Sequence, residues 1–151
     1  MEKAAAIVYL SELGFEPKVA WAFSKKINAM VYSVSPKKTG FLGTGPVEVK
    51  VDNKVNISMV EAPLVIVGSN AKEGVLSQYT PAFVDQLDLS GKKTVVFVVG
   101  QGGDSSQALA DLAQACTAKG ADILSTISFE VGASEEQMEL AVTKLLEGKG
   151  D

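Results

Sequence analysis

Five short apolar segments alternate along the chain with segments in which apolar residues recur at helical spacing. The short segments have the length and the continuous hydrophobicity that strands buried on both faces require. They are Ala4–Leu10, Met30–Val34, Leu64–Val67, Thr94–Val99 and Ile123–Phe129. Gly68 follows the third of these segments and is predicted to end that strand.

The intervening segments carry the start and stop signals of helices. Pro17 suits a first helical turn, and apolar residues then recur on one face at Val19, Ala20, Phe23, Ile27 and Met30. Thr80-Pro81 predicts a helix over Pro81–Leu87. Two segments have capping-box spacing: Asp104–Gln107 opens a helix to about Lys119, ended by Gly120, and Ser134–Gln137 opens a helix through Leu146.

Strands that alternate with helices predict a doubly wound α/β fold of three layers, a parallel five-stranded sheet with helices on both faces. The segment Val47–Met59 breaks this alternation, because its apolar and polar residues alternate as in a β-hairpin or ribbon. It follows a Gly/Pro-rich loop, Pro36–Pro46, and takes the place of a second helix. Ligands of such sheets bind beyond the carboxyl ends of the strands, which directs attention to the three loops there. These are Leu10–Glu16, Gly68–Tyr79 and Gly100–Ser106.

Composition excludes several classes of chemistry. The length of 151 residues predicts a single domain over 1–151. The sequence contains no histidine, and all 14 basic residues are lysines. Imidazole catalysis, histidine-bound metals and bidentate guanidinium contacts are therefore excluded. The single cysteine, Cys116, shares a helical stripe with leucines and is expected in the core.

The net charge of −4 makes the protein a poor binder of nucleic acid. No stretch approaches the length of a membrane span, and the apolar run near the N-terminus is too short for a secretory signal. These patterns predict a cytoplasmic protein that contacts neither nucleic acid nor membrane.

Four segments, in order, resemble flavodoxins. They are IVYLSELGFEPKVA (residues 7–20), VGSNAKEG (67–74), PAFVDQLDLSGKKTVVFVVG (81–100) and GGDSS (102–106). The resemblance covers most of the chain outside Pro36–Met59. It implies strand order 2-1-3-4-5 and an FMN cofactor at the switch point of the sheet. The residues that it would bring to FMN are Ser11, Glu12, Leu13, Gly14, Phe15, Glu16, Ser69, Asn70, Ala71, Tyr79, Gly100, Gln101, Gly102, Gly103 and Asp104.

The first loop of the family holds phosphate with hydroxyls and with backbone N–H groups at a helix N-terminus. In this chain Ser11 and Gly14 match that pattern, whereas Glu12, Leu13 and Glu16 stand where hydroxyls would be. A carboxylate at ~5 Å from a phosphate charge costs roughly 3 kcal/mol at an effective dielectric of ~20. Alternatively, one of the two carboxylates occupies the N–H groups that phosphate would use.

The aromatic residues that usually stack on the flavin ring are also replaced. Gln107 follows the serines of the third loop, and Lys72 lies near the aromatic position of the second. Tyr79 could supply an aromatic ring to a flavin, or it packs on its own loop. Asp104 and the two serines after it could bind the polar edge of a flavin, or they cap the following helix.

The resemblance implies FMN-dependent one-electron transfer to redox partner proteins, with no acid–base catalytic residue. The alternative is a flavodoxin-like domain without flavin that acts as a protein-interaction or structural module. A flavin or quinone reductase would need a second nucleotide site, which the sequence does not reveal. A receiver domain would need acidic residues that Glu12 and Gly68 do not supply. We also predict a homodimer with Val47–Met59 or Trp21 at the contact, because a β-ribbon offers unpaired edges.

Overall fold

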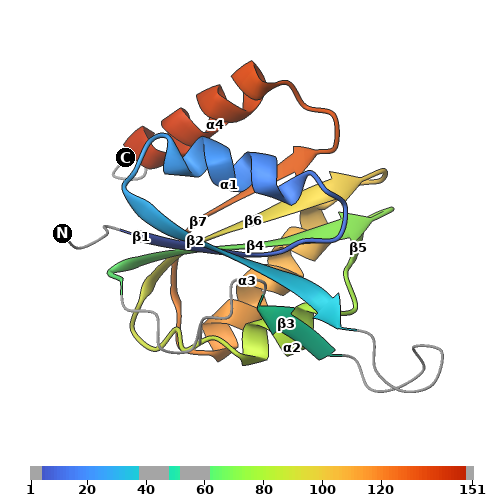
Figure 1. Cartoon of the computed structure of the whole chain (residues 1–151), viewed down its shortest axis with the longest axis vertical. Helices are drawn as coiled ribbons and strands as arrows, with labels where there is room; N and C mark the ends of the chain where they lie inside the picture. Colours follow the sequence, from blue (N-terminus) through green and yellow to red (C-terminus); the bar gives the residue numbers. More distant parts are fainter. Residues whose placement is uncertain (1–4, 38–47, 52–61, 149–151) are drawn as a thin grey trace.

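The computed structural model describes residues 5–37, 48–51 and 62–148, and it is built on one mostly parallel sheet (Figure 1). The strands are β1 Ala5–Leu10, β2 Ala29–Lys37, β3 Glu48–Val51, β4 Leu64–Lys72, β5 Val75–Leu76, β6 Lys93–Gln101 and β7 Asp122–Glu130. The helices are α1 Glu16–Ser24, α2 Thr80–Asp85, α3 Ser106–Ala118 and α4 Glu135–Gly148.

The strand order is β3-β2-β1-β4-β6-β7, and β5 pairs with β4 off this path. Five strands, β2, β1, β4, β6 and β7, are mutually parallel. Counted along the chain, these five have the predicted order 2-1-3-4-5, so the doubly wound α/β prediction is confirmed. The antiparallel pairs, β2 with β3 and β4 with β5, lie outside that parallel core.

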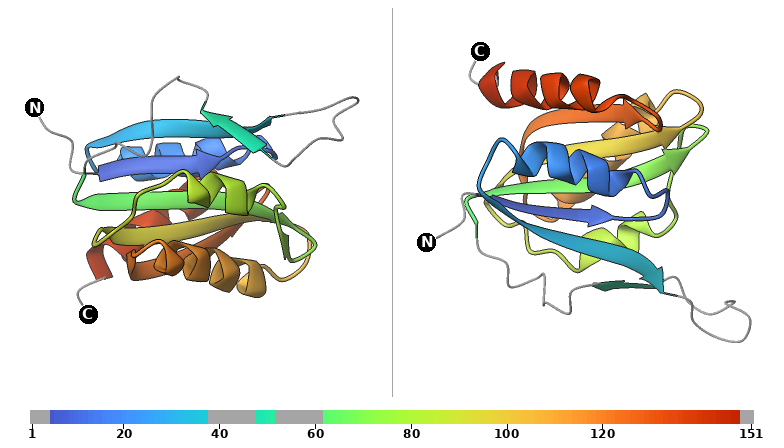
Figure 2. Two further views of the ribbon diagram at one scale, coloured as in Figure 1. Left: turned by 90° about the horizontal axis from the view of Figure 1, so that it is seen from below. Right: turned by 45° about the horizontal axis from the view of Figure 1, so that its top comes forward.

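Helices α1 and α4 cover one face of the sheet, and α2 and α3 cover the other (Figures 1 and 2). Alternate residues of the central strands supply two separate cores, as the period of two in a strand requires. Ile7, Ile66 and Phe97 pack under α1 and α4 with Phe23 and Val142. On the other face Val8, Val67 and Val98 pack with Phe83 and Leu112.

Two of the predicted helices end earlier than their apolar patterns suggest. Helix α1 stops at Ser24, and Met30 belongs to β2. Ile27 still packs against the same core as α1, so its place in the stripe reflects packing beyond the helix end. Helix α2 stops at Asp85 rather than Leu87, although Leu87 remains buried.

Gly68 does not end its strand, as the sequence predicted, because β4 continues to Lys72. Gly68 is the register partner of Phe97 on β6. A Cβ atom at Gly68 would lie 2.0 Å from Cζ of Phe97, so only glycine leaves room for this ring. The Phe97 ring in turn stacks on Phe23 of α1, with ring centroids 6.0 Å apart. The glycine therefore accommodates a core aromatic residue inside the strand.

The predicted ribbon is described only in part. Residues 48–51 form β3, antiparallel to β2 with Val49 opposite Pro36, and the rest of Val47–Met59 lies outside the described residues. Pro36 and Lys37, predicted as the start of a loop, belong to β2.

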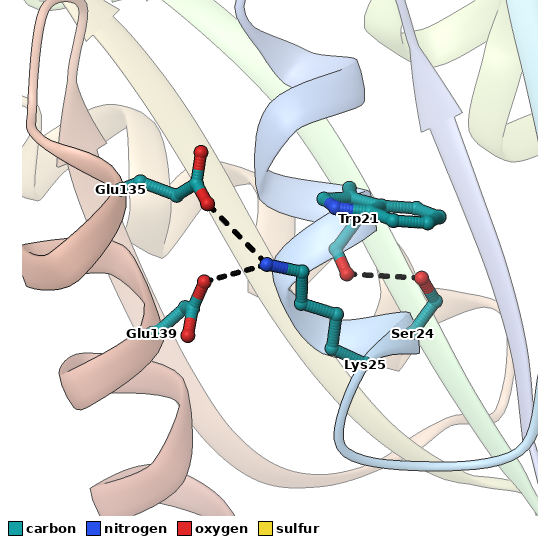
Figure 3. Close-up of polar contacts among 5 residues, drawn as sticks. All are labelled: Trp21, Ser24, Lys25, Glu135 and Glu139. Atoms are coloured by element: carbon teal, nitrogen blue, oxygen red, sulfur yellow. Dashed lines mark hydrogen bonds and ion pairs between the residues drawn. The ribbon is translucent and has the colours of Figure 1, made fainter.

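A cluster around Lys25 joins α1 to α4 (Figure 3). The Lys25 ammonium donates hydrogen bonds to Glu139 at 2.7 Å and to Glu135 at 3.3 Å. These bonds raise the pKa of Lys25 and, with Lys25 as the main cause, lower the pKa of Glu139. The same ammonium lies 5.9 Å from the ring centroid of Trp21. The side chains of this cluster are partly exposed to solvent, so its ion pairs contribute little to stability.

In the part of the chain that the structure describes, no helix is long and apolar enough to cross a membrane.

Candidate functional site

The carboxyl ends of the parallel strands point to one edge of the sheet, and three segments meet there (Figure 1). The first loop, residues 11–15, joins β1 to α1. The β4–β5 turn is formed by residues 73 and 74, and the third loop, residues 102–105, joins β6 to α3. This edge lies at the switch point, because the chain leaves β1 toward β2 and afterwards returns to β4 on the other side.

The Glu16 side chain closes the first loop from inside. Glu16 is the first residue of α1, yet it is 0% exposed. Its carboxylate accepts hydrogen bonds from the backbone N–H of Glu12 at 3.0 Å and from that of Leu13 at 3.0 and 3.2 Å. This is the alternative arrangement, in which a carboxylate takes the N–H groups that a phosphate would use.

The other predicted residues of the first loop serve structural contacts. The backbone N–H of Ser11 donates to the Val34 carbonyl at 2.7 Å. Phe15 is buried, and Leu13 packs against the same α1/α4-side core. Gly14 has φ +81°, a left-handed conformation that favours glycine. The loop is thus held by its neighbours on both sides.

The Glu12 carboxylate ties the first loop to the segment around β4 and β5. It accepts hydrogen bonds from the Asn70 side-chain amide at 3.2 Å and from the Ser77 hydroxyl. The Asn70 amide also donates to the Leu10 carbonyl at 3.4 Å. The Glu12 carboxylate is therefore held by these two side chains, whereas the Glu16 carboxylate takes the N–H groups of the loop.

Three residues predicted for the second flavin-contacting loop lie inside a strand instead. Ser69, Asn70 and Ala71 are buried residues of β4, because that strand runs past Gly68. The Ser69 hydroxyl is hydrogen-bonded to the Thr80 hydroxyl at 2.8 Å, which ties β4 to the start of α2. Ser69 and Ala71 therefore serve packing.

Tyr79 precedes α2 and packs against the core under α2 and α3. Its backbone N–H donates a hydrogen bond to the Ser77 hydroxyl at 3.2 Å. This is the arrangement in which the tyrosine packs locally.

The third loop begins later than predicted, because Gly100 and Gln101 belong to β6. Gly102 and Gly103 follow with φ +79° and +72°, which the glycines make possible. The Asp104 carboxylate accepts bonds from the Ser106 hydroxyl at 2.6 Å and the Ser106 N–H at 2.9 Å. These bonds lower the pKa of Asp104.

The predicted capping box at Asp104–Gln107 is wrong, since Asp104 bonds Ser106 two residues later instead of the N–H of Gln107. The same spacing at the start of α4 does form a capping box. There the Gln137 N–H donates to the Ser134 hydroxyl at 3.1 Å, and the Ser134 N–H donates to the Gln137 amide oxygen at 2.9 Å.

The β4–β5 turn lies directly on the third loop. The Glu73 N–H donates to the Gln101 carbonyl at 3.0 Å. A Cβ atom at Gly103 would lie 2.7 Å from the Glu73 carbonyl carbon, and one at Gly74 would lie 2.8 Å from the Asp104 carbonyl oxygen. A planar ring between two surfaces needs roughly 7 Å, twice the carbon contact distance of ~3.5–4.0 Å. The two segments leave no such gap where they touch.

One hydroxyl of the third loop has no hydrogen-bond partner among the described residues. Ser105 precedes α3, and its Oγ is buried without a hydrogen bond. A Cβ atom at Gly100 would lie 2.2 Å from this oxygen, so the glycine makes room for the serine.

The residues at this edge do not fit FMN as the described structure holds them. The Glu16 carboxylate takes the N–H groups of the first loop, and the β4–β5 turn covers the third loop. Lys72 and Gln107, which stand near the stacking positions, are exposed and not aromatic. Groups of this chain therefore occupy the positions where the resemblance to flavodoxins would place the phosphate and the ring of FMN.

Three residues that shape this edge are absent from the predicted site residues: Glu73, Ser77 and Thr80. Each acts through a contact with a residue distant in the sequence or across the sheet, as Ser77 does with Glu12. The spacing of residues along the sequence does not predict such contacts.

No protein-family model matches the chain, and no curated protein matches it either. Solved structures do. A candidate flavoprotein from Bacteroides uniformis aligns with a TM-score of 0.71 at 16% identity, over 95% of this chain and 100% of that one. A Lactobacillus acidophilus flavoprotein in complex with FMN aligns with a TM-score of 0.64 at 15% identity, over 84% and 93%.

A flavodoxin from Streptococcus pneumoniae TIGR4 aligns with a TM-score of 0.61 at 18% identity, over 95% of this chain and 98% of that one. The three alignments cover 84–95% of this chain and 93–100% of the other chains, at identities that establish the fold alone. Together with the strand order, it shows that this chain has the flavodoxin-like fold.

Proposed function

We propose that this chain is a flavodoxin-like domain that works without FMN, as a protein-interaction module. The observation that carries the proposal is the buried Glu16 carboxylate on the backbone N–H groups of Glu12 and Leu13. Those groups are the ones that the family pattern would offer to phosphate. Because its own side chain takes these N–H groups, the domain no longer offers them to the phosphate of the cofactor.

Energetic estimates support this proposal. A phosphate ~5 Å from the Glu16 carboxylate would cost roughly 3 kcal/mol at an effective dielectric of ~20. Displacing the carboxylate would instead break hydrogen bonds to a charged group, worth ~1.5–3 kcal/mol each. Either cost is large against about −8 kcal/mol, the binding free energy of a micromolar ligand.

A second copy of the chain is the partner that we propose. Strand β3 forms the end of the described sheet and pairs there only with β2, so its outer backbone groups face away from the sheet. Such an edge is a template for another strand. Trp21 is 61% exposed, beside a hollow of about 380 Å³ that Pro17 and Met138 line. Exposed tryptophans often anchor interfaces.

The second candidate function is FMN-dependent electron transfer to redox partner proteins. The similarity to a flavoprotein that was solved in complex with FMN favours it. It would require Glu16 to leave its backbone partners and the β4–β5 turn to separate from the third loop.

An FMN titration separates the two functions. If the proposal holds, the purified protein is colourless and does not quench FMN fluorescence up to high micromolar concentration. A yellow protein, or saturable quenching, would show that the chain binds FMN, which would remove the first candidate and support the second. Sedimentation at tens of micromolar tests the partner, because a monomer there would rule out the homodimer.

A further inference from the structure

We propose that Glu16 alone determines the ligand specificity of the first loop, as a built-in anion that keeps phosphate groups out of a seat the backbone still provides. This inference rests on the proposed function, because a wild-type chain that bound FMN phosphate would have an open seat. It assigns the seat a ligand class, the phosphate dianion and phosphomonoesters, that wild-type Glu16 excludes.

The seat is formed by the backbone. The N–H groups of Glu12 and Leu13 are consecutive and converge on one carboxylate, with Glu16 Oε2 at 3.0 Å from both nitrogens. Successive N–H groups that point into one concavity bind anions. Gly14 turns the chain next to them with its φ of +81°, and the positive end of the α1 dipole lies immediately beyond. These donors remain when the Glu16 side chain is removed.

Burial shows that the carboxylate fills the seat. A charged group is buried only when it is paired or hydrogen-bonded, and Glu16 is 0% exposed. The hydrogen bonds that the structure gives its carboxylate come from the loop backbone. A tetrahedral oxyanion would need the same donors and the same volume, so the two anions exclude each other.

The neighbouring side chains leave the seat to Glu16. Leu13 packs toward the core under α1 and α4. The Glu12 carboxylate accepts hydrogen bonds from Asn70 and Ser77. Glu12 therefore contributes its backbone N–H, and not its side chain, to the seat. A single substitution at position 16 therefore suffices to open the site.

The test compares wild type with Glu16→Ser and Glu16→Gln. Serine removes the carboxylate and frees its volume, whereas glutamine keeps an acceptor oxygen of nearly the same size in the seat. Inorganic phosphate is titrated at constant ionic strength while the amide resonances of Glu12 and Leu13 are followed by NMR. We expect saturable shifts of both resonances in Glu16→Ser, with an affinity at least about tenfold higher than in wild type or Glu16→Gln. A folded Glu16→Ser variant that shows no such gain overturns the inference.

A measurement on the wild-type protein keeps the test decisive if Glu16→Ser does not fold. Hydrogen exchange of the Glu12 and Leu13 amides should be protected, because both are bonded to a buried carboxylate. Exchange at the rates of an unstructured peptide, or phosphate-dependent shifts of these amides in wild type, would overturn the inference. Failure of the proposed function looks different: wild type itself would then bind FMN.

Discussion

The first and third loops lie in equivalent places in the fold, but different parts of the chain occupy or cover them. Each leads from a buried parallel strand to a helix at the same edge of the sheet, and each has an acidic residue beside the helix start. Next to the first loop, Glu16 of α1 is buried and accepts hydrogen bonds from the backbone N–H groups of Glu12 and Leu13. In the third loop Asp104 is exposed and binds Ser106, while the β4–β5 turn covers the glycines.

The difference shows that a loop before a helix can be filled by a buried side chain of that helix or covered by the backbone of a neighbouring turn. Burial decides how much each carboxylate contributes, because an exposed carboxylate can be replaced by water and a buried one cannot. The comparison therefore predicts unequal consequences when the two loops are altered in the same way.

The largest effect is expected for Glu16→Ala. The variant removes the charged acceptor of the part-buried N–H groups of Glu12 and Leu13, and hydrogen bonds to a charged group are worth ~1.5–3 kcal/mol each, so the free energy of unfolding should fall by about 3 kcal/mol. Urea unfolding measures this loss. Asp104→Ala is the matched change in the third loop and should cost far less. Equal losses in the two variants would contradict the comparison.

Gly103→Ala is expected to lower the free energy of unfolding by about 2 kcal/mol, because the new Cβ would meet the Glu73 backbone at 2.7 Å and φ is +72°. Gly132→Ala is the control. Gly132 also has a positive φ, +95°, but a Cβ there meets nothing within 4 Å. The excess loss in Gly103→Ala over Gly132→Ala, from urea unfolding, measures the contact between the turn and the third loop. No excess would mean that the turn yields easily.

Opening the first loop alone should not create a flavin site. In Glu16→Ser we expect FMN to bind no more than about tenfold (1.4 kcal/mol) more tightly than inorganic phosphate, since the third loop stays covered by the β4–β5 turn. Calorimetry with phosphate, FMN and riboflavin tests this. Tight riboflavin binding would show that the covered loop opens readily to the ring.

The smallest effect concerns Asp104 and pH. Its hydrogen bonds from Ser106 hold the pKa of Asp104 below the ordinary value of 3.8. A depressed folded-state pKa stabilises the protein above the unfolded-state pKa, and this contribution is lost as pH falls through the lower folded-state value. The stability difference between wild type and Asp104→Asn should therefore be constant from pH 7 to about 5 and shrink in more acidic solution. Urea unfolding across this range measures it, and a difference that grows in acid would contradict the assignment.

The fold could be predicted from the sequence because its signals are local. Continuous apolar runs such as Ala5–Leu10 mark buried strands, and their alternation with segments of helical spacing predicts the topology. Gly68 shows where local reasoning stops. Gly68 leaves room for the Phe97 ring on the neighbouring strand, and the spacing of residues within β4 does not predict this contact.

The candidate site could be predicted only as a set of loops and alternatives. That a carboxylate would compete for the N–H groups of the first loop followed from charge alone. Which carboxylate does so depends on three-dimensional partners: Asn70 and Ser77 hold Glu12, and this leaves Glu16 for the seat. Likewise, the cover over the third loop depends on the β4–β5 turn, which the sequence presented as part of an open loop.

A carboxylate that is part of the chain differs from a bound cofactor in how its occupancy of a site depends on concentration. A dissociable ligand stabilises its protein in proportion to the logarithm of its free concentration, so the edge it organises loosens whenever supply falls. Glu16 is covalently attached five residues after Ser11, at a fixed effective concentration that dilution cannot lower. The ordered state of this first loop is therefore independent of cofactor supply, at the cost of any response to it.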